Sequence, residues 1–389
     1  EKSHAQITES PESIFVKKIE AILLNSCLRT KNFGVKIHSL ERDKTLYSVY
    51  SDRLFSPASN LKLLTTAVAL KRLGANYRFK TALYATLPIV GKILEGDIYI
   101  KGFGDPNLVS EQMWLLANEL KNSPLKKVRG NIIADASFFD SNRRVKTWNK
   151  KAGVEAYNAP LGALSFNFNT VAVHVTPGEK KGDRPIVVVD PDIEFIRVDN
   201  RARTASKPKY GRLIVNRVDR GDHNVITVSG TMPVNSRRET YYLNITQPTH
   251  YAAMVFKEYL LQAGVEVMGK VRVGSVPEGA YELFSHESIP LSLILRGLNK
   301  FSNNFVAEQI LKTIAAEIYG EPGTTLNGLR AMDEYMQSLQ YKAEEFSILD
   351  GSGLSRESQL SPDQIVSVLQ DMYEDLGVYP EFISALGVM

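Results

Sequence analysis

The feature that most constrains the fold is a long β-rich stretch between two helical parts of the chain. Helical spacing of apolar residues dominates up to Gly74 and dominates again from Ile289 onward. Between these points short strand-like runs dominate, separated by turns rich in Gly, Asp, Asn and Pro. An excursion of about two hundred residues is unusually long within one core. The pattern therefore predicts an α+β fold in which one helical unit is split by a β-rich insert.

The insert itself has two textures. Residues 170–243 are almost purely β in pattern, and helices expected over 112–120 and 250–263 flank them. We therefore predict three domains, two of them discontinuous: an α+β domain over 1–76 and 280–389, an insert domain over 77–165 and 244–279, and a small all-β domain over 166–243 nested in the insert. The expected strands of the insert are 79–86, 93–100, 128–134, 171–175, 185–189, 193–198, 212–217, 224–230 and 265–273.

The outer segments carry most of the helices. Ser56 can cap a helix, Pro57 suits its first position, and Gly74 ends it. A capping box over Ser361–Gln364 predicts another helix near the C-terminal end. The remaining expected elements are a helix opening at Ser10-Pro11, strands over 33–40, 45–50 and 346–349, and helices over 291–298, 306–318 and 325–339.

Ser59 and Lys62 are the first pair of residues with catalytic potential. They lie three residues apart at the start of the helix predicted from Ser56, so both side chains fall on one face. A buried lysine that loses its proton can activate a serine hydroxyl, and first-turn N–H groups can face a developing oxyanion. Because Ser-X-X-Lys is common by chance, a capped helix with a solvated lysine is the alternative interpretation.

Composition excludes several classes of function. The net charge is +4 with basic residues spread along the chain, which gives no support for nucleic-acid binding. Cys27 is the only cysteine, so no disulfide can form within the chain, and the six histidines are scattered without a metal-binding pattern. No apolar run is long enough to span a bilayer. The chain begins at Glu1 with no visible signal peptide, as a mature exported protein or a shortened chain would.

A second set of polar residues complements the first pair. Ser302 could pass a proton between Lys62, Ser59 and a leaving group, and Asn304 could hold the lysine and donate to a substrate carbonyl. Ser-X-X-Lys followed by Ser-X-Asn is the motif pair of penicillin-binding proteins and serine β-lactamases. The glycine- and serine-rich stretch Asp350–Arg356 completes the pattern.

On these motifs the chain resembles the class C low-molecular-mass penicillin-binding proteins, the D-alanyl-D-alanine carboxypeptidase/endopeptidase family. The resemblance covers residues 33–389 and implies a penicillin-binding/β-lactamase-like transpeptidase domain, over 1–76 and 280–389, with nested inserts. It also implies a periplasmic or extracytoplasmic serine D,D-peptidase that acts on peptidoglycan peptides, is acylated by β-lactams and needs no metal or other cofactor. The further stretches that carry it are Phe55–Lys62, Gly102–Pro106, Asp135, Tyr157–Pro160 and Ser302–Glu308.

The resemblance assigns roles residue by residue. Ser59 would be the nucleophile, Lys62 its base, Ser302 the proton relay and Asn304 the polar anchor. The Ser59 N–H would form half of an oxyanion hole. The expected substrate-binding residues are Arg356, Ser352 and Tyr157, with a surface-loop arginine as the alternative for Arg356.

Two departures from the family pattern stand out. The third motif, Lys-Thr/Ser-Gly, is absent from the chain, and we expect it, with a closing helix, beyond Met389. Lys150 and Lys151 follow Trp148 and Asn149 where relatives often carry an acid, which leaves the side-chain preference for the substrate open.

Three functions follow from these patterns. The first is the serine D,D-peptidase; the second is a catalytically silent relative that binds peptidoglycan as a scaffold; the third is a β-lactamase or esterase with the same chemistry. Peripheral association with a membrane is compatible with all three. The balance of carboxypeptidase and endopeptidase action and the oligomeric state stay open.

Overall fold

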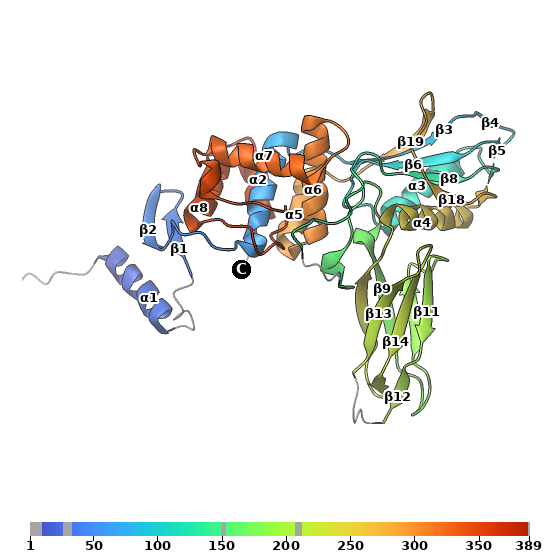
Figure 1. Ribbon diagram of the computed structural model, residues 1–389, viewed down its shortest axis with the longest axis horizontal. Coiled ribbons are helices and arrows are strands. Elements are labelled where there is room, and N and C mark those ends of the chain that lie inside the picture. Colours follow the sequence, from blue (N-terminus) through green and yellow to red (C-terminus); the bar gives the residue numbers. More distant parts are fainter. Residues whose placement is uncertain (1–9, 26–32, 149–152, 207–211, 388–389) are drawn as a thin grey trace, which may run out of the picture.

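The computed structural model describes residues 10–25, 33–148, 153–206 and 212–387. Figure 1 shows the elements arranged along one long direction: a helix and hairpin at one end, a group of helices in the middle, and β-sheets at the other end. The helices of the middle group come from both ends of the sequence, as their blue and orange-to-red colours show. The α+β fold predicted from the alternating textures is confirmed.

Helix α2 (Leu61–Leu73) lies at the centre of the helical group. Its residues Leu61 to Leu70 are buried except for Leu63, so the helix is enclosed on nearly all sides. The helices that share its apolar core are α5 (Leu291–Phe301), α6 (Asn304–Tyr319), α7 (Thr325–Ser338), α8 (Pro362–Glu374) and α9 (Tyr379–Ala385). Two sequences separated by the whole insert therefore build one core.

The start of α2 differs from the prediction. Ser56 makes no cap; a single 3-10 turn, Ala58–Asn60, precedes the α-helix, and Pro57 stands before that turn with no side-chain cap hydrogen bond. Ala58 has a positive φ of 47°, which breaks the regular helix and delays the α-helical start to Leu61. Gly74 ends the helix as predicted, with φ 84°. The capping box of Ser361 and Gln364 at the start of α8 is confirmed.

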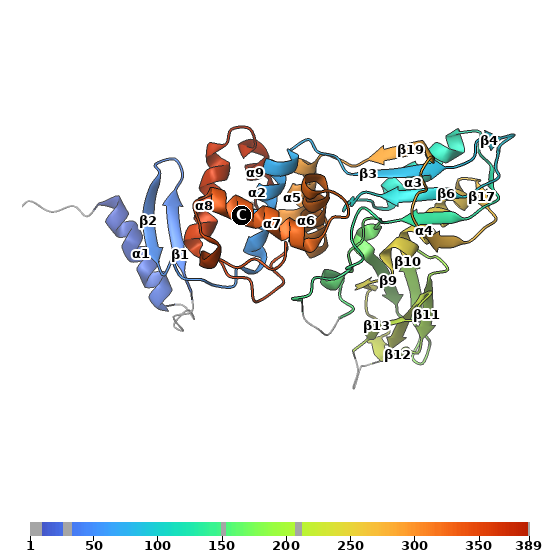
Figure 2. The same cartoon turned by 45° about the horizontal axis from the view of Figure 1, so that its top comes forward.

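The N-terminal end is a helix beside a hairpin. Helix α1 (Pro11–Asn25) lies against the antiparallel pair β1 (Val35–Ser39) and β2 (Lys44–Val49), as Figure 2 shows. These three elements agree with the sequence prediction to within two residues at each end of the strands. The predicted strand over 346–349 is reduced to one isolated bridge between Ser347 and Gln359.

The insert begins with a five-stranded sheet in the order β18-β8-β6-β3-β19. Its last strand, β19, lies beyond the boundary predicted at residue 280, because its antiparallel pairing with β3 keeps the chain in this sheet to Glu287. Each of the three strands predicted over 93–100, 128–134 and 265–273 is broken in two. The second pieces join this sheet, and the first pieces form, together with β4, a four-stranded sheet in the order β17-β7-β5-β4. The strands of the two sheets are β3 (Lys80–Ala85), β4 (Ile89–Val90), β5 (Ile93–Leu94), β6 (Ile98–Gly102), β7 (Lys127–Val128), β8 (Ile132–Asp135), β17 (Glu266–Val267), β18 (Val271–Val273) and β19 (Tyr281–Glu287).

Helices α3 (Ser110–Asn122) and α4 (Pro248–Gln262) pack beside these sheets. A further group of strands lies below these helices in Figure 1. It consists of three small sheets with the strand orders β10-β9-β16, β11-β14-β13 and β12-β15. One continuous apolar core joins α3, α4, the larger sheets and this group. The strands are β9 (Thr170–Thr176), β10 (Ile186–Asp190), β11 (Ile196–Asn200), β12 (Arg203–Ala205), β13 (Ile214–Asp219), β14 (Asn224–Ser229), β15 (Thr231–Pro233) and β16 (Glu239–Asn244); β12, β15 and β16 were not predicted.

One segment of the insert packs against the helical core instead. Val145, Trp148, Ala159 and Leu161 belong to the apolar cluster built around α2 and α6. An ion pair between buried Lys312 and partly buried Asp140 adds to this contact: Lys312 of α6 donates to Asp140 Oδ1 at 2.5 Å and to the Asn142 carbonyl at 2.8 Å. The described residues 140–148 and 159–161 therefore pack against the helical core that contains α6.

Candidate active site

Ser59 lies in the exposed 3-10 turn at the head of α2. The turn is fixed from the other side by a close approach of Gly353, where an added Cβ would lie 1.8 Å from the Ala58 carbonyl oxygen. Gly353 also has φ 76°, a conformation that favours glycine. The Ser59 hydroxyl therefore lies on a turn whose backbone packs directly against the loop over residues 350–355.

Lys62 lies below Ser59 and is buried, with 2% of its surface exposed. Its Nζ is 2.6 Å from the Ser352 carbonyl oxygen, 2.8 Å from Asn304 Oδ1 and 3.3 Å from Ser59 Oγ. The first two partners can only accept hydrogen bonds. When the Lys62 amine is neutral, it therefore donates its two N–H groups to these two oxygens, and its lone pair faces the Ser59 hydroxyl.

Ser302 and Asn304 reach the same point from the junction of α5 and α6. Ser302 ends α5 in the left-handed conformation, and its Oγ donates to Ser59 Oγ at 2.9 Å. Asn303 caps α6 by accepting from the Val306 N–H at 3.2 Å, which places Asn304 at the first position of the helix. The structure thus brings together the four predicted catalytic side chains, although most of the chain separates the two pairs.

Burial sets the electrostatics of the site. It lowers the pKa of Lys62 to about 8, although Glu308 and Asp350 nearby act in the opposite direction. A lysine with this pKa is partly neutral near pH 7.5, unlike a solvated lysine. The arrangement can therefore take a proton from Ser59, and Ser302 supplies a second hydroxyl through which that proton can pass.

The loop after residue 349 is organised by Asp350, which is fully buried. Its carboxylate accepts hydrogen bonds from the Trp148 ring N–H at 3.0 Å and from backbone N–H groups of Gly353 and Ser355 at 2.8 and 2.7 Å. Ser352 is buried too, with its hydroxyl 3.3 Å from Asp350 Oδ2. The predicted substrate contact of Ser352 is therefore not made by an open side chain; its carbonyl oxygen holds Lys62 instead.

Arg356 and Tyr157 line an open cavity of about 630 Å³. Tyr157 is 55% exposed, and its carbonyl oxygen accepts from Asn304 Nδ2 at 3.4 Å, so the cavity adjoins the catalytic side chains. The other lining residues are Thr147, Gly153, Glu155, Asn158, Leu354 and Glu357. Lys150 and Lys151, which raised the question of side-chain preference, lie outside the described residues.

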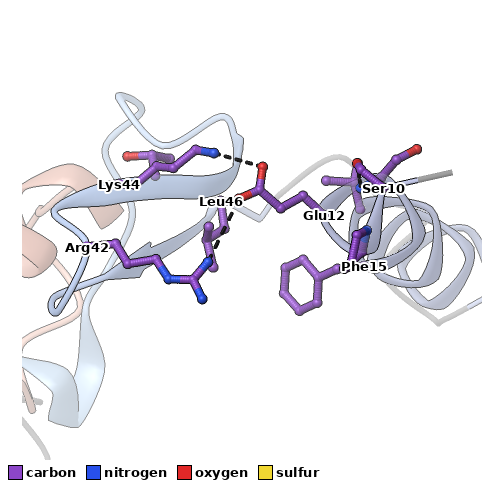
Figure 3. A pocket seen from close by; sticks show the side chains of 10 residues that line it. Ser10, Glu12, Phe15, Arg42, Lys44 and Leu46 are labelled. Atoms are coloured by element: carbon purple, nitrogen blue, oxygen red, sulfur yellow. Dashed lines mark hydrogen bonds and ion pairs between the residues drawn. The ribbon is translucent and has the colours of Figure 1, made fainter. Parts of the chain in front are cut away.

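A second, separate hollow lies between α1 and the β1–β2 hairpin. Figure 3 shows Glu12 reaching across it toward Lys44 and Arg42, with Phe15 beside it. The Glu12 carboxylate is 2.7 Å from Lys44 Nζ and 3.9 Å from an Arg42 guanidinium nitrogen. These groups join the helix to the hairpin and include none of the predicted catalytic residues.

Sequence reasoning gave no role to two residues that support the site. In the sequence, Trp148 served only to locate Lys150 and Lys151. In the structure, its ring N–H donates a hydrogen bond to Asp350. Glu308 was part of the stretch Ser302–Glu308 but was given no role of its own. In the structure it is fully buried and accepts a hydrogen bond from the Gly351 N–H at 2.9 Å. The available signal that Glu308 faces inward was its place one turn after Asn304 on a largely apolar helix, directly after Phe305, Val306 and Ala307.

A serine hydroxyl between a buried amine and a second hydroxyl, on a helical domain split by a β-rich insert, defines a serine acyl-transfer enzyme. Residues 15–388 match the D-Ala-D-Ala carboxypeptidase 3 (S13) family. The chain belongs to this family and is a serine peptidase.

Known relatives agree with this assignment. The chain is 34% identical over 376 residues to the D-alanyl-D-alanine carboxypeptidase of Actinomadura sp. (strain R39), covering 94% of this chain and 68% of that one. It is 26% identical to D-alanyl-D-alanine carboxypeptidase DacB of Haemophilus influenzae, covering 87% and 70%. The crystal structure of penicillin binding protein 4 (dacB) from Haemophilus influenzae has the same fold, with a TM-score of 0.79 at 24% identity over 90% of this chain and 76% of that one.

Two kinds of feature are missing from the described part of the chain. In residues 10–25, 33–148, 153–206 and 212–387, no three His, Cys, Asp or Glu side chains are grouped to hold a metal ion. None of the helices within these ranges is both long and apolar enough to cross a bilayer.

Proposed function

We propose that this protein is a serine D,D-peptidase that cleaves the terminal D-Ala-D-Ala bond, or an equivalent cross-link, of peptidoglycan peptides through an acyl-enzyme on Ser59. The observation that carries the proposal is the hydrogen-bond pattern at Lys62, which leaves its lone pair for the Ser59 hydroxyl. Family membership supplies the substrate class.

In the acylation step, Ser59 Oγ attacks the carbonyl carbon of the scissile peptide while Lys62 Nζ takes the hydroxyl proton. As the C–N bond breaks, Ser302, 2.9 Å from Ser59 Oγ, gives its hydroxyl proton to the leaving amine and takes the proton held by Lys62, which returns the lysine amine to its neutral form. The products are the free amino acid or peptide and an ester on Ser59. In the second half of the reaction, water attacks this ester while Lys62 takes a proton from the water. The ester C–O bond to Ser59 then breaks, and Lys62 returns the proton to Ser59 Oγ, which releases the carboxylic acid product and restores the enzyme.

The carbonyl oxygen becomes negative during both attacks. The N–H of Ser59 belongs to the first turn of its helix, where N–H groups lack intrahelical acceptors. This N–H is our candidate for one donor to the oxyanion. Asn304 holds Lys62 through Oδ1, and its amide group lies between Lys62 and Tyr157, where a substrate backbone would enter.

The cavity lined by Tyr157 and Arg356 is the candidate subsite for the peptide that is acylated. Arg356 offers a positive charge to a carboxylate of the stem peptide, and the exposed Tyr157 offers an aromatic wall. Glu155 and Glu357 line the same cavity, so it presents both signs of charge to a substrate side chain.

Because a β-lactam offers a strained amide to the same nucleophile, we propose that β-lactams acylate Ser59 and inhibit the enzyme. A relative of the same fold has been crystallised as a complex with a novel β-lactam. An enzyme of peptidoglycan works outside the cytoplasm, so we further propose an extracytoplasmic, in Gram-negative cells periplasmic, location without a nucleic-acid partner.

The test is incubation of the full-length protein with a fluorescent penicillin, followed by a D-Ala release assay on a D-Ala-D-Ala peptide. We expect a stable covalent label that Ser59→Ala abolishes without changing the melting temperature, and release of D-Ala by the wild type. A label that survives Ser59→Ala would refute the nucleophile. Labelling without D-Ala release would favour the silent scaffold, and rapid penicillin turnover would favour a β-lactamase.

A further inference from the structure

Glu308 is a buried acid beneath the candidate base that the reaction above does not use. It lies on α6 one turn after Asn304, which binds Lys62. Its side chain is fully buried. Its Oε1 accepts the Gly351 N–H at 2.9 Å, and its Oε2 is buried and makes no hydrogen bond within 3.5 Å to a described residue.

The neighbouring acid, Asp350, has a very different environment. Three N–H donors and the Ser352 hydroxyl point at its carboxylate, which is the environment that stabilises a buried negative charge. Glu308 has one donor in hydrogen-bond geometry, the Gly351 N–H, although the Ser352 hydroxyl and N–H also favour its charged form. Its Oε2 is buried without a hydrogen bond to a described residue, and a buried, unpaired oxygen that carries charge is costly. Of the two acids, Glu308 is therefore the one whose environment suits a protonated carboxyl.

The charge of Glu308 matters because of what surrounds it. Lys62 from α2 and Asp350 from the loop are the ionisable groups coupled to it, while Lys312, one turn further along α6, is engaged by Asp140. Burial, and next the charge of Asp350, raises the pKa of Glu308 to about 8, although the hydroxyl and N–H donors of the adjoining loop act in the opposite direction. An ionised Glu308 would raise the pKa of Lys62 and keep the amine protonated.

We propose that Glu308 is a positioning residue for Lys62: it fixes the loop whose Ser352 carbonyl binds the amine, and by keeping its own proton it withholds a second negative charge that would keep the lysine protonated. The loop contact is direct, since the Gly351 N–H bound by Glu308 precedes Ser352 in the chain and Thr65 of α2 donates to the Gly351 carbonyl at 2.6 Å. This inference rests on the proposed role of Lys62 as the base.

The experiment measures the second-order rate of penicillin acylation against pH for the wild type and for Glu308→Gln. Gln keeps the acceptor for Gly351 and can never ionise. Glu308 is protonated below its pKa of about 8 and ionises over the same pH range as Lys62, so in the wild type its charge delays the upper part of the rising limb. We therefore expect the midpoint of the limb to lie lower by about 0.5 in pH in Glu308→Gln, with little change in rate on the acid side, where Glu308 is already neutral. Glu317→Gln, the same change at an exposed position of the same helix, should leave the profile unchanged.

A profile for Glu308→Gln that keeps the wild-type midpoint and only scales down at every pH would reduce Glu308 to a structural residue and overturn the proposal. Absence of Ser59-dependent labelling in the wild type would overturn the proposed function and this inference with it. The two failures are thus distinguished by whether the wild type reacts.

A second measurement keeps the proposal testable if Glu308→Gln fails to fold. Infrared spectra at pH 7 detect the carbonyl band of a protonated buried carboxyl. Asp105, whose pKa burial raises to about 7, would give a similar band, so the spectra are taken in an Asp105→Asn background. We expect a protonated-carboxyl band to remain there, and its absence would refute a protonated Glu308.

Discussion

At the scale of single residues, the chemistry depends on how Lys62 is surrounded. Its nitrogen has two carbonyl oxygens and one hydroxyl as partners and no carboxylate within hydrogen-bonding distance among the described residues. A carboxylate in direct contact would have stabilised the ammonium and removed the base. The two acids of the site instead act on Lys62 only through their charge.

The pH dependence of acylation follows from this environment. Burial lowers the pKa of Lys62 to about 8, so the amine is protonated below that pH and neutral above it. We expect the acylation rate of the wild type to rise with pH, with a midpoint near that value, and then to level off. Stopped-flow labelling with a chromogenic β-lactam measures the profile.

Lys62→Met tests whether Lys62 causes the rise of the acylation rate with pH. It should lower the rate by about 10²–10⁴-fold and flatten the pH dependence, because the base is gone. Lys71→Met on the same helix removes an ammonium that pairs with Asp375 and should leave the limb in place. A rate that is independent of pH in the wild type would contradict the role of Lys62.

At the scale of elements, the loop over residues 350–355 is the part that joins the two halves of the site. Gly353→Ala should disturb it, because the new Cβ would lie 1.8 Å from the Ala58 carbonyl oxygen beside Ser59. We expect a loss of acylation much larger than the loss of stability. Gly264→Ala is the matched control, since it has a similar φ of 82° with nothing within 4 Å. Equal effects of the two substitutions on acylation would mean that the close approach has no consequence.

The contact between α6 and the insert depends on the ion pair of Lys312 and Asp140. Lys312 is 1% exposed and Asp140 is 18% exposed, so Lys312→Met leaves a largely buried carboxylate without its partner. The expected loss is about 3 kcal/mol in the free energy of unfolding, measured by urea denaturation.

Lys101→Met provides the comparison for Lys312. Its ammonium lies 3.6 Å from a Glu321 carboxylate that is half exposed, so its loss should cost no more than about 1 kcal/mol. A Lys312→Met protein as stable as Lys101→Met would show that the α6 contact is held by apolar packing alone.

At the scale of the whole molecule, the described residues form two large apolar cores. One surrounds α2 and α6, and the other joins the sheets of the insert with α3 and α4. Leu70→Ala removes a side chain from the first core and Leu116→Ala from the second, at a cost of about 2–5 kcal/mol each.

Calorimetry distinguishes the two cores. We expect Leu70→Ala to lower the melting temperature of a transition that covalently bound penicillin also shifts, because Ser59 belongs to the domain of that core. Leu116→Ala should lower the melting temperature of a second transition that penicillin does not change. A single transition lowered equally by both substitutions would show that the two cores unfold together.

Much of this architecture could be predicted from local patterns. Helices α1, α2 and α8 carry start or stop signals in the sequence, and the run of strand-like segments identified the insert. The failures have structural causes. Ser56 did not cap α2, because the backbone at Ala58 adopts a positive φ and a 3-10 turn forms first. Strand β19 extended the insert sheet past residue 280, because its pairing with β3 overrode the local signal.

The sequence by itself determined the chemical types at the site and the two motifs that carry them, since a serine with a lysine three residues on and a serine with an asparagine two residues on are local patterns. Only the tertiary structure decided that the two motifs meet, that Lys62 is buried against two carbonyl oxygens, and that Glu308 and Asp350 lie beside it. The physical reason is that burial and charge coupling, which set the pKa of a lysine, come from residues hundreds of positions away in the chain.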